Sequence, residues 1–134
     1  MSQVIVFWSG TGNTEDIANK IRNDLDCDIF KLSEADVSEI LKYDTIILGC
    51  PAMGAEELED SEFRPFYEAL MSEASGKNIA LFGSYGWGDG EWMRTWADEV
   101  NGFGCNLLTD GLIVNGDSSA IDDAEYDKFI SYLR

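Results

Sequence analysis

A short run of small polar residues, Ser9-Gly10-Thr11-Gly12-Asn13-Thr14, has the composition of an anion-binding loop. It supplies three hydroxyl groups, one side-chain amide and several backbone N–H groups at the start of a helical pattern, where all of them can donate to one phosphate. The loop contains no Lys or Arg, which excludes the GxxxxGK[ST] loop of nucleoside triphosphatases, and Glu15 stands where GxGxxG requires its third glycine. The run therefore predicts a site for a single terminal monophosphate.

Two further segments are suited to a planar ring. In Ser84-Tyr85-Gly86-Trp87-Gly88-Asp89 no neighbouring Cβ crowds the tryptophan, so its ring can lie flat on an apolar ligand. Pro51-Ala52-Met53-Gly54-Ala55-Glu56 offers a soft thioether for the opposite face of that ligand. Gly54 stands at the third place of a predicted four-residue turn, where a positive φ is required.

The remaining acidic and aromatic residues near these segments are expected to have ordinary structural roles. Trp92 and Trp96 are four residues apart on a predicted helix and should lie in the core, whereas the pattern leaves Trp8 and Tyr85 undecided. A set of carboxylates after the second segment is expected to form a solvated acidic face: Glu57, Glu59, Asp60 and Glu62.

Strand and helix patterns alternate along the chain. Strands are predicted at 4–8, 28–32, 45–50 and 78–83, and a fifth is divided near Gly111 into 106–108 and 112–114. Helices are predicted at 15–25, 37–41, 63–74, 92–100 and 126–133, the third with Gly76 as its C-cap. This alternation predicts a single α/β domain over residues 1–134, with a doubly wound five-stranded parallel sheet of order 2-1-3-4-5 and helices on both faces. The polar segments follow strands one, three and four, so they should meet at one edge of the sheet.

Composition narrows the function classes. The 134 residues include 26 Asp and Glu against 9 Lys and Arg, a formal charge of −17. Such a surface repels nucleic-acid backbones and anionic lipids and favours basic partners. The chain has no His, which removes the commonest general base and metal ligand, so no catalytic or metal-binding residue is predicted.

The cysteines and the N-terminal residues point to a reducing compartment. Cys27, Cys50 and Cys105 are odd in number and widely spaced, so free, buried thiols are expected. No basic leader or long apolar run precedes the first predicted strand, and we therefore expect a cytoplasmic protein.

The segment at 9–14, directly after a strand, resembles the FMN phosphate loop of the flavodoxins. The segments at 51–57 and 83–90 are similar to that family's two flavin-flanking loops, and the short tail after Cys105 resembles the short-chain flavodoxins of anaerobic bacteria. The resemblance implies that Glu56 accepts a hydrogen bond from the flavin ring N3–H and that backbone near Asp89 holds the pyrimidine end. Pro51 departs from members with a phosphate-binding serine there, so Ser84 is expected to take more of that role.

These features together predict a flavodoxin-like, low-potential one-electron carrier that uses non-covalently bound FMN and shuttles electrons between redox enzymes. It should be a monomer that forms transient complexes with partners whose docking surfaces are basic. An FMN-dependent reductase or a flavoprotein maturation partner on the same fold is the alternative. A phospho-acceptor domain is disfavoured, because Trp8-Ser9 and Cys50-Pro51 occupy the places that its carboxylates need.

Overall fold

The computed structural model describes residues 2–134 and contains six strands and five α-helices, which alternate along the chain except that the last two strands follow one another before the final helix. The strands are β1 (Gln3–Phe7), β2 (Asp28–Lys31), β3 (Thr45–Gly49), β4 (Asn78–Ser84), β5 (Asn106–Leu107) and β6 (Leu112–Val114). The helices are α1 (Asn13–Leu25), α2 (Val37–Ile40), α3 (Phe63–Met71), α4 (Glu91–Gly102) and α5 (Asp123–Ser131), and short 3₁₀ turns cover Leu32–Glu34 and Ser118–Ala120.

All the strand pairs are parallel, in the order β2-β1-β3-β4-β5. β5 pairs with the amino end of β4, and β6 pairs with its carboxyl end through Phe82–Ser84. Gly111, between the two short strands, has a φ of +108° that favours glycine. The predicted strand order and the division of the fifth strand are confirmed.

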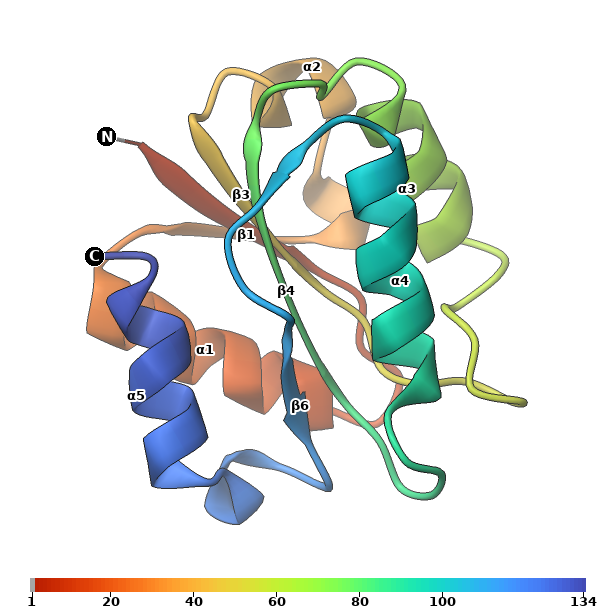
Figure 1. Ribbon diagram of the computed structural model, residues 1–134, viewed down its shortest axis with the longest axis vertical. Coiled ribbons are helices and arrows are strands. Elements are labelled where there is room, and N and C mark those ends of the chain that lie inside the picture. Colours follow the sequence, from red (N-terminus) through yellow and green to blue (C-terminus); the bar gives the residue numbers. More distant parts are fainter. Residues whose placement is uncertain (1) are drawn as a thin grey trace.

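The sheet is covered on both faces, which explains why its strands are apolar throughout. Figure 1 shows α1 and α5 on one side of the sheet and α3 and α4 on the other. Alternate strand residues point to the two sides: Ile5 and Ile47 pack toward α1 and α5, whereas Val6 and Leu48 pack toward α3 and α4. All four are fully buried, so the strand ends are held on a rigid platform.

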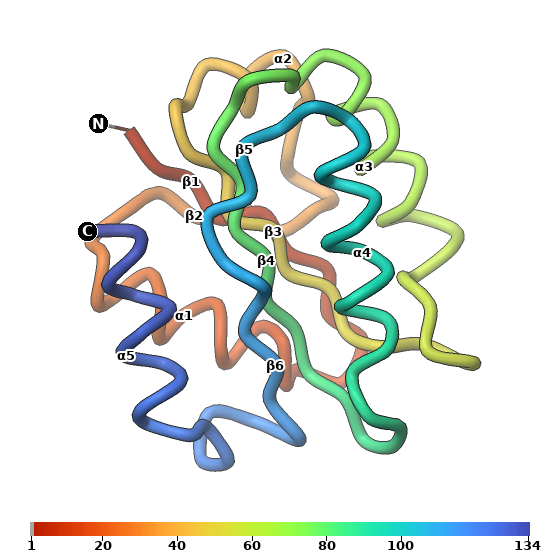
Figure 2. The backbone as a smooth tube through the Cα atoms, in the orientation of Figure 1, coloured from red at the N-terminus to blue at the C-terminus, as the bar shows by residue number. Residues whose placement is uncertain are grey.

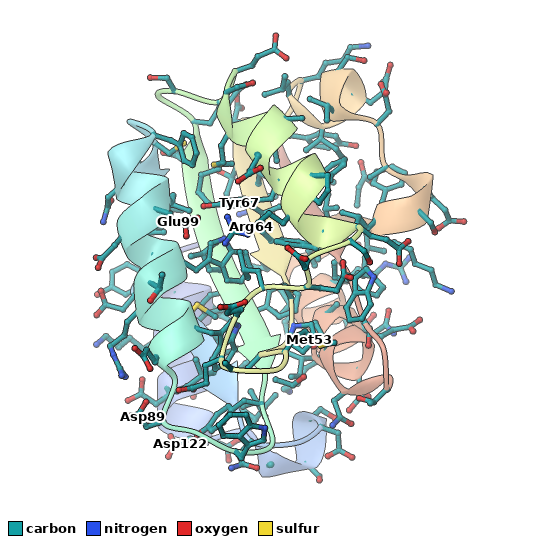
Figure 3. The ribbon with its side chains drawn as sticks, turned by 90° about the vertical axis from the view of Figure 1, so that its right-hand side faces the viewer. Met53, Arg64, Tyr67, Asp89, Glu99 and Asp122 are labelled. Carbon is teal, nitrogen blue, oxygen red and sulfur yellow. The ribbon has the colours of Figure 1, made fainter. Side chains whose placement is uncertain are left out.

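An ion pair joins the two helices on the second face. The Arg64 guanidinium of α3 donates from Nη1 and Nη2 to the two carboxylate oxygens of Glu99 on α4, each at 3.3 Å. The Tyr67 hydroxyl donates to the same carboxylate at 3.2 Å, and the three side chains lie together between the helices (Figure 3). This contact fixes α4 relative to α3 above the buried aromatic rings.

The end of α3 differs from the prediction. The helix ends at Met71 with Ser72 as C-cap, and Gly76 is not its cap. The chain tightens after the helix, because Glu73 and Ala74 donate to carbonyls only three residues back. Gly76, at a φ of +85°, instead lies in the turn toward β4 and donates to the Gly104 carbonyl at 3.0 Å.

The three cysteines are free thiols, as predicted. Cys50 and Cys105 are buried, but Cys27 is only half-buried, because it lies at the turn between α1 and β2 rather than inside the sheet. Burial raises the pKa of Cys27 to about 11 and that of Cys50 to about 12. Within residues 2–134, no helix combines the length and the apolar character needed to cross a bilayer.

Candidate functional site

The loops after β1, β3 and β4 meet at the carboxyl edge of the sheet, at the lower right of the backbone trace (Figure 2). Backbone hydrogen bonds connect the strand ends from which they leave. Trp8 N–H donates to the Gly49 carbonyl at 3.0 Å, and Ala52 N–H donates to the Ser84 carbonyl at 3.0 Å. The structure thus brings the three predicted segments together.

The loop after β1 is wrapped around the Ser9 hydroxyl. Ser9 Oγ accepts from Gly12 N–H at 3.1 Å and from Glu15 N–H at 3.4 Å. Gly12, the N-cap of α1, has a φ of +98° that a side chain would strain. The helix therefore starts abruptly, and first-turn N–H groups that have no partner inside a helix face the loop. Gly10 and Thr11 are exposed, and Asn13 is half-buried.

Two buried hydroxyl groups join this loop to the loop after β4. Thr14 Oγ1 lies 2.8 Å from Ser84 Oγ, and the two residues are 1% and 4% exposed. A hydrogen bond between two hydroxyls uses one of their two protons and leaves the other to be donated elsewhere. The loop at 9–14 contains no Lys or Arg, so this remaining proton and the first-turn N–H groups of α1 are the donors that it offers to a phosphate oxygen. This donor set suits a phosphate monoester.

The loop after β3 forms a narrow turn. Met53 N–H donates to the Glu57 carbonyl at 2.8 Å, and Glu57 N–H donates back to the Met53 carbonyl at 2.9 Å. Gly54 has a φ of +51°, which confirms the positive value predicted for it. Glu56 has a φ of +56°, an unusual conformation for a residue with a side chain. Ala55, between them, is exposed.

The Glu56 carboxylate connects this turn to α4. Its Oε1 accepts from Gly90 N–H at 3.1 Å and from Glu91 N–H at 3.2 Å, at the helix N-terminus where a negative charge is stabilised. These donors compensate for the strained backbone of Glu56. The resemblance seen in the sequence implied a role for Glu56 toward the flavin ring and did not identify the helix as its partner.

The same carboxylate occupies the space that a side chain at Gly88 would need. A Cβ on Gly88 would lie 2.4 Å from both Cδ and Oε1 of Glu56, and its φ is +88°. We expect Gly88→Ala to destabilise the protein by about 1–2 kcal/mol from backbone strain alone, plus the cost of displacing Glu56. Urea unfolding of the apoprotein measures this change.

Gly86→Ala is the matched control, because nothing lies within 4 Å of a Cβ at that position. Glu56→Ala removes the carboxylate that a side chain at position 88 would displace. Gly88→Ala should therefore lower the free energy of unfolding less in the Glu56→Ala background than in the wild type. Equal destabilisation by Gly88→Ala in both backgrounds would show that the carboxylate is not the reason why glycine is required at position 88.

Two large apolar side chains remain exposed on adjacent loops. Trp87 is 65% exposed and Met53 is 39% exposed, and Figure 3 shows Met53 on the loop after β3. Trp92 and Trp96 are buried, as predicted. Tyr85, undecided from the sequence, is half-buried with its ring 5.5 Å from that of Trp92. The exposed Trp87 ring and Met53 thioether lie on loops next to the predicted phosphate-binding loop, and this arrangement indicates a binding site for a flat ring.

The Asp89 side chain has a protein partner. Arg94 Nη2 donates to its Oδ1 at 3.1 Å, and Arg94 Nη1 donates to the Asp89 carbonyl at 3.1 Å. Both side chains are largely exposed, so the pair adds little to stability. It does hold the end of the loop against the first turn of α4.

Glu59 does not belong to a solvated acidic face, and that prediction was wrong for it. The residue is 6% exposed, and its carboxylate accepts from the Ser61 hydroxyl and from the N–H groups of Ser61, Glu62 and Phe63 at 2.6–3.0 Å. Burial alone would raise its pKa, but these hydrogen bonds outweigh that effect and lower the pKa to about 2. Glu59 therefore caps the start of α3, while Glu57, Asp60 and Glu62 are exposed as predicted.

Comparison with known proteins relates this chain and its three loops to one protein family. Residues 5–129, which include all three loops, match the sequence profile of the family described as Flavodoxin. A flavodoxin of Clostridium beijerinckii is 48% identical over 128 residues, covering 92% of this chain and 91% of that protein. A flavodoxin of Megasphaera elsdenii is 43% identical over 114 residues, covering 81% and 83% of the two chains. The solution structure of two-electron reduced Megasphaera elsdenii flavodoxin superposes with a TM-score of 0.87 at 38% identity, covering 98% of this chain and 99% of that one.

Proposed function

Because this chain belongs to the flavodoxin family, we propose that its loops after β1, β3 and β4 hold FMN and determine how it exchanges electrons. The chain is an FMN-binding electron carrier and not an enzyme, and the alternatives of a reductase or a maturation partner are not favoured. Bound FMN supplies the redox chemistry, while the protein binds and orients it.

The phosphate is assigned to the loop after β1. Ser9 fixes the loop, and Thr11, Asn13 and Thr14 donate to the phosphate together with the N–H groups at the start of α1. Ser84 shares this role through its hydrogen bond to Thr14. The observation that carries this assignment is the buried pair of hydroxyls, Thr14 and Ser84. One of their two protons has no acceptor within the pair, and a phosphate oxygen can accept it.

The ring is assigned to the two other loops. The exposed Trp87 and Met53 side chains suit the two faces of a flavin, and burying them there removes apolar surface from water. Glu56 keeps its second carboxylate oxygen for the ring N3–H while the first is held at α4. The backbone of Pro51, Ala52, Gly86 and Gly88 is assigned to the edge of the ring.

The charge distribution supports a low reduction potential. Carboxylates stand in the loops assigned to the ring, and Arg94, in the first turn of α4, is already paired with Asp89. These charges oppose the negative charge that reduction adds to the flavin. Each tenfold loss of affinity for the reduced form relative to the oxidised form lowers a one-electron potential by about 59 mV. The free thiols are compatible with a reducing compartment such as the cytoplasm.

Three observations on the purified protein test the proposal directly. It should be yellow, release FMN on acid treatment, and fail to turn over NADH or NADPH without a separate reductase. Catalytic NAD(P)H oxidation by the protein alone would instead support the reductase.

Partners are redox enzymes, and we propose that they dock through basic surfaces at the acidic loops. With cytochrome c as a basic electron acceptor, the bimolecular rate constant should fall on the order of tenfold from low to high ionic strength. Asp60→Lys, an exposed site before α3, should slow the reaction at low ionic strength and leave FMN affinity unchanged.

The control for that variant is Glu73→Lys, which makes the same change of charge just past the other end of α3. It should slow the reaction less than Asp60→Lys, because it lies away from the carboxyl edge of the sheet. Equal slowing by both variants would show that only net charge matters, and a rate independent of salt would contradict basic docking altogether.

A further inference from the structure

Trp8 lies between β1 and the phosphate loop, and its ring lies beside Gly10 of that loop. A Cβ on Gly10 would come within 3.1 Å of Cη2 and 3.3 Å of Cζ3 of the indole. The loop backbone therefore lies beside the six-membered ring, and a side chain at position 10 would be crowded against it. The Trp8 side chain is half-buried and packs against the core on the α3 side of the sheet.

The indole is held from its other end by the start of α3. Trp8 Nε1–H donates to Oε1 of Glu62 at 3.1 Å, across 54 positions of the chain. Glu62 is itself fixed, because its backbone N–H donates at 2.7 Å to the buried Glu59 carboxylate that caps the helix. A continuous series of contacts thus runs from the α3 cap to the backbone of Gly10.

We propose that Trp8 and Glu62 are positioning residues for the FMN phosphate. Glu62 orients the indole, the indole supports Gly10, and Gly10 lies between the Ser9 hydroxyl and the Thr11 donor of the phosphate loop. This inference rests on the proposed FMN site and adds two residues that sequence patterns did not assign to it. It explains why a carboxylate is placed near an anion site: its hydrogen bond fixes the loop geometry, although its charge opposes the ligand.

The test separates loop geometry from charge and from general stability. Apoprotein variants are titrated with FMN and, separately, with riboflavin, which lacks the phosphate. Glu62→Ala should raise the Kd for FMN about tenfold, equivalent to about 1.4 kcal/mol, and leave the Kd for riboflavin unchanged. Glu62→Gln keeps an acceptor for the indole and should bind FMN at least as tightly as the wild type.

Two controls complete the experiment. Asp60→Ala removes an equal charge from the same segment without touching the indole, and it should not weaken FMN binding. Trp8→Phe removes the N–H donor, and in its background Glu62→Ala should have little additional effect. Urea unfolding of each apoprotein checks that it is folded.

The outcomes are distinct. Tighter FMN binding by Glu62→Ala would show that charge repulsion alone acts at Glu62 and would overturn the proposal. Equal losses for FMN and riboflavin would also overturn it, because they would reflect general damage to the site. If the wild type itself binds FMN no better than riboflavin, the phosphate assignment fails rather than this inference alone.

Discussion

Thr14→Val should lower the affinity of the apoprotein for FMN by about 10- to 150-fold, the effect of losing a charge-assisted hydrogen bond of about 1.5–3 kcal/mol. Valine preserves the branched shape of a side chain that is 1% exposed, so packing at the start of α1 is maintained. The Ser84 hydroxyl loses its partner at the same time. Isothermal titration of the apoprotein with FMN measures the change.

Riboflavin provides the internal comparison for this variant. Its affinity should be nearly unaffected, because the hydroxyl pair is assigned to the phosphate. Thr95→Val, at an exposed position on α4, is the matched substitution that should change neither affinity. Thr11→Ala should resemble Thr14→Val. An equal loss for riboflavin and FMN, or FAD binding as tight as FMN, would contradict a site built for a terminal monophosphate.

Glu59→Gln should lower the free energy of unfolding at pH 7 by about 3 kcal/mol. The folded pKa is about 2 against an ordinary value of 4.5, so the ionised carboxylate stabilises the native state by about 1.36 kcal/mol for each unit of that difference. The amide that replaces it cannot accept from all the donors at the start of α3, which leaves buried N–H groups without partners.

The pH dependence gives this prediction a second readout. Because the folded pKa is the lower one, the contribution of Glu59 is fully present above about pH 4.5 and is lost as the pH falls toward 2. Urea titrations across that range should show a steeper loss for the wild type than for Glu59→Gln. Asp60→Asn, at the exposed neighbouring position, is the control and should keep the wild-type slope. Parallel curves for Glu59→Gln and the wild type would contradict the capping role.

Local sequence patterns were sufficient for most of the fold. Apolar runs such as 45–50 identified strands buried on both faces, and the three- and four-residue spacing of apolar residues identified α3 and α4. Loop composition identified the segments that now share one edge of the sheet. Both kinds of signal are local, because strand burial, helix periodicity and turn chemistry are expressed within a few neighbouring residues. The end of α3 was missed because its tightening last turn depends on weak preferences that the sequence does not mark.

The pairings within the site were decided by the tertiary structure. Thr14 and Ser84 are 70 positions apart, and Glu56 reaches α4 across 34 positions, so no local pattern could assign either contact. The sequence determined that Glu56, Glu57, Glu59, Asp60 and Glu62 were carboxylates in one segment. Only packing determined that Glu59 is buried as a helix cap, Glu56 holds α4 and Glu62 holds an indole, because a carboxylate acquires its role from the donors that the fold brings to it.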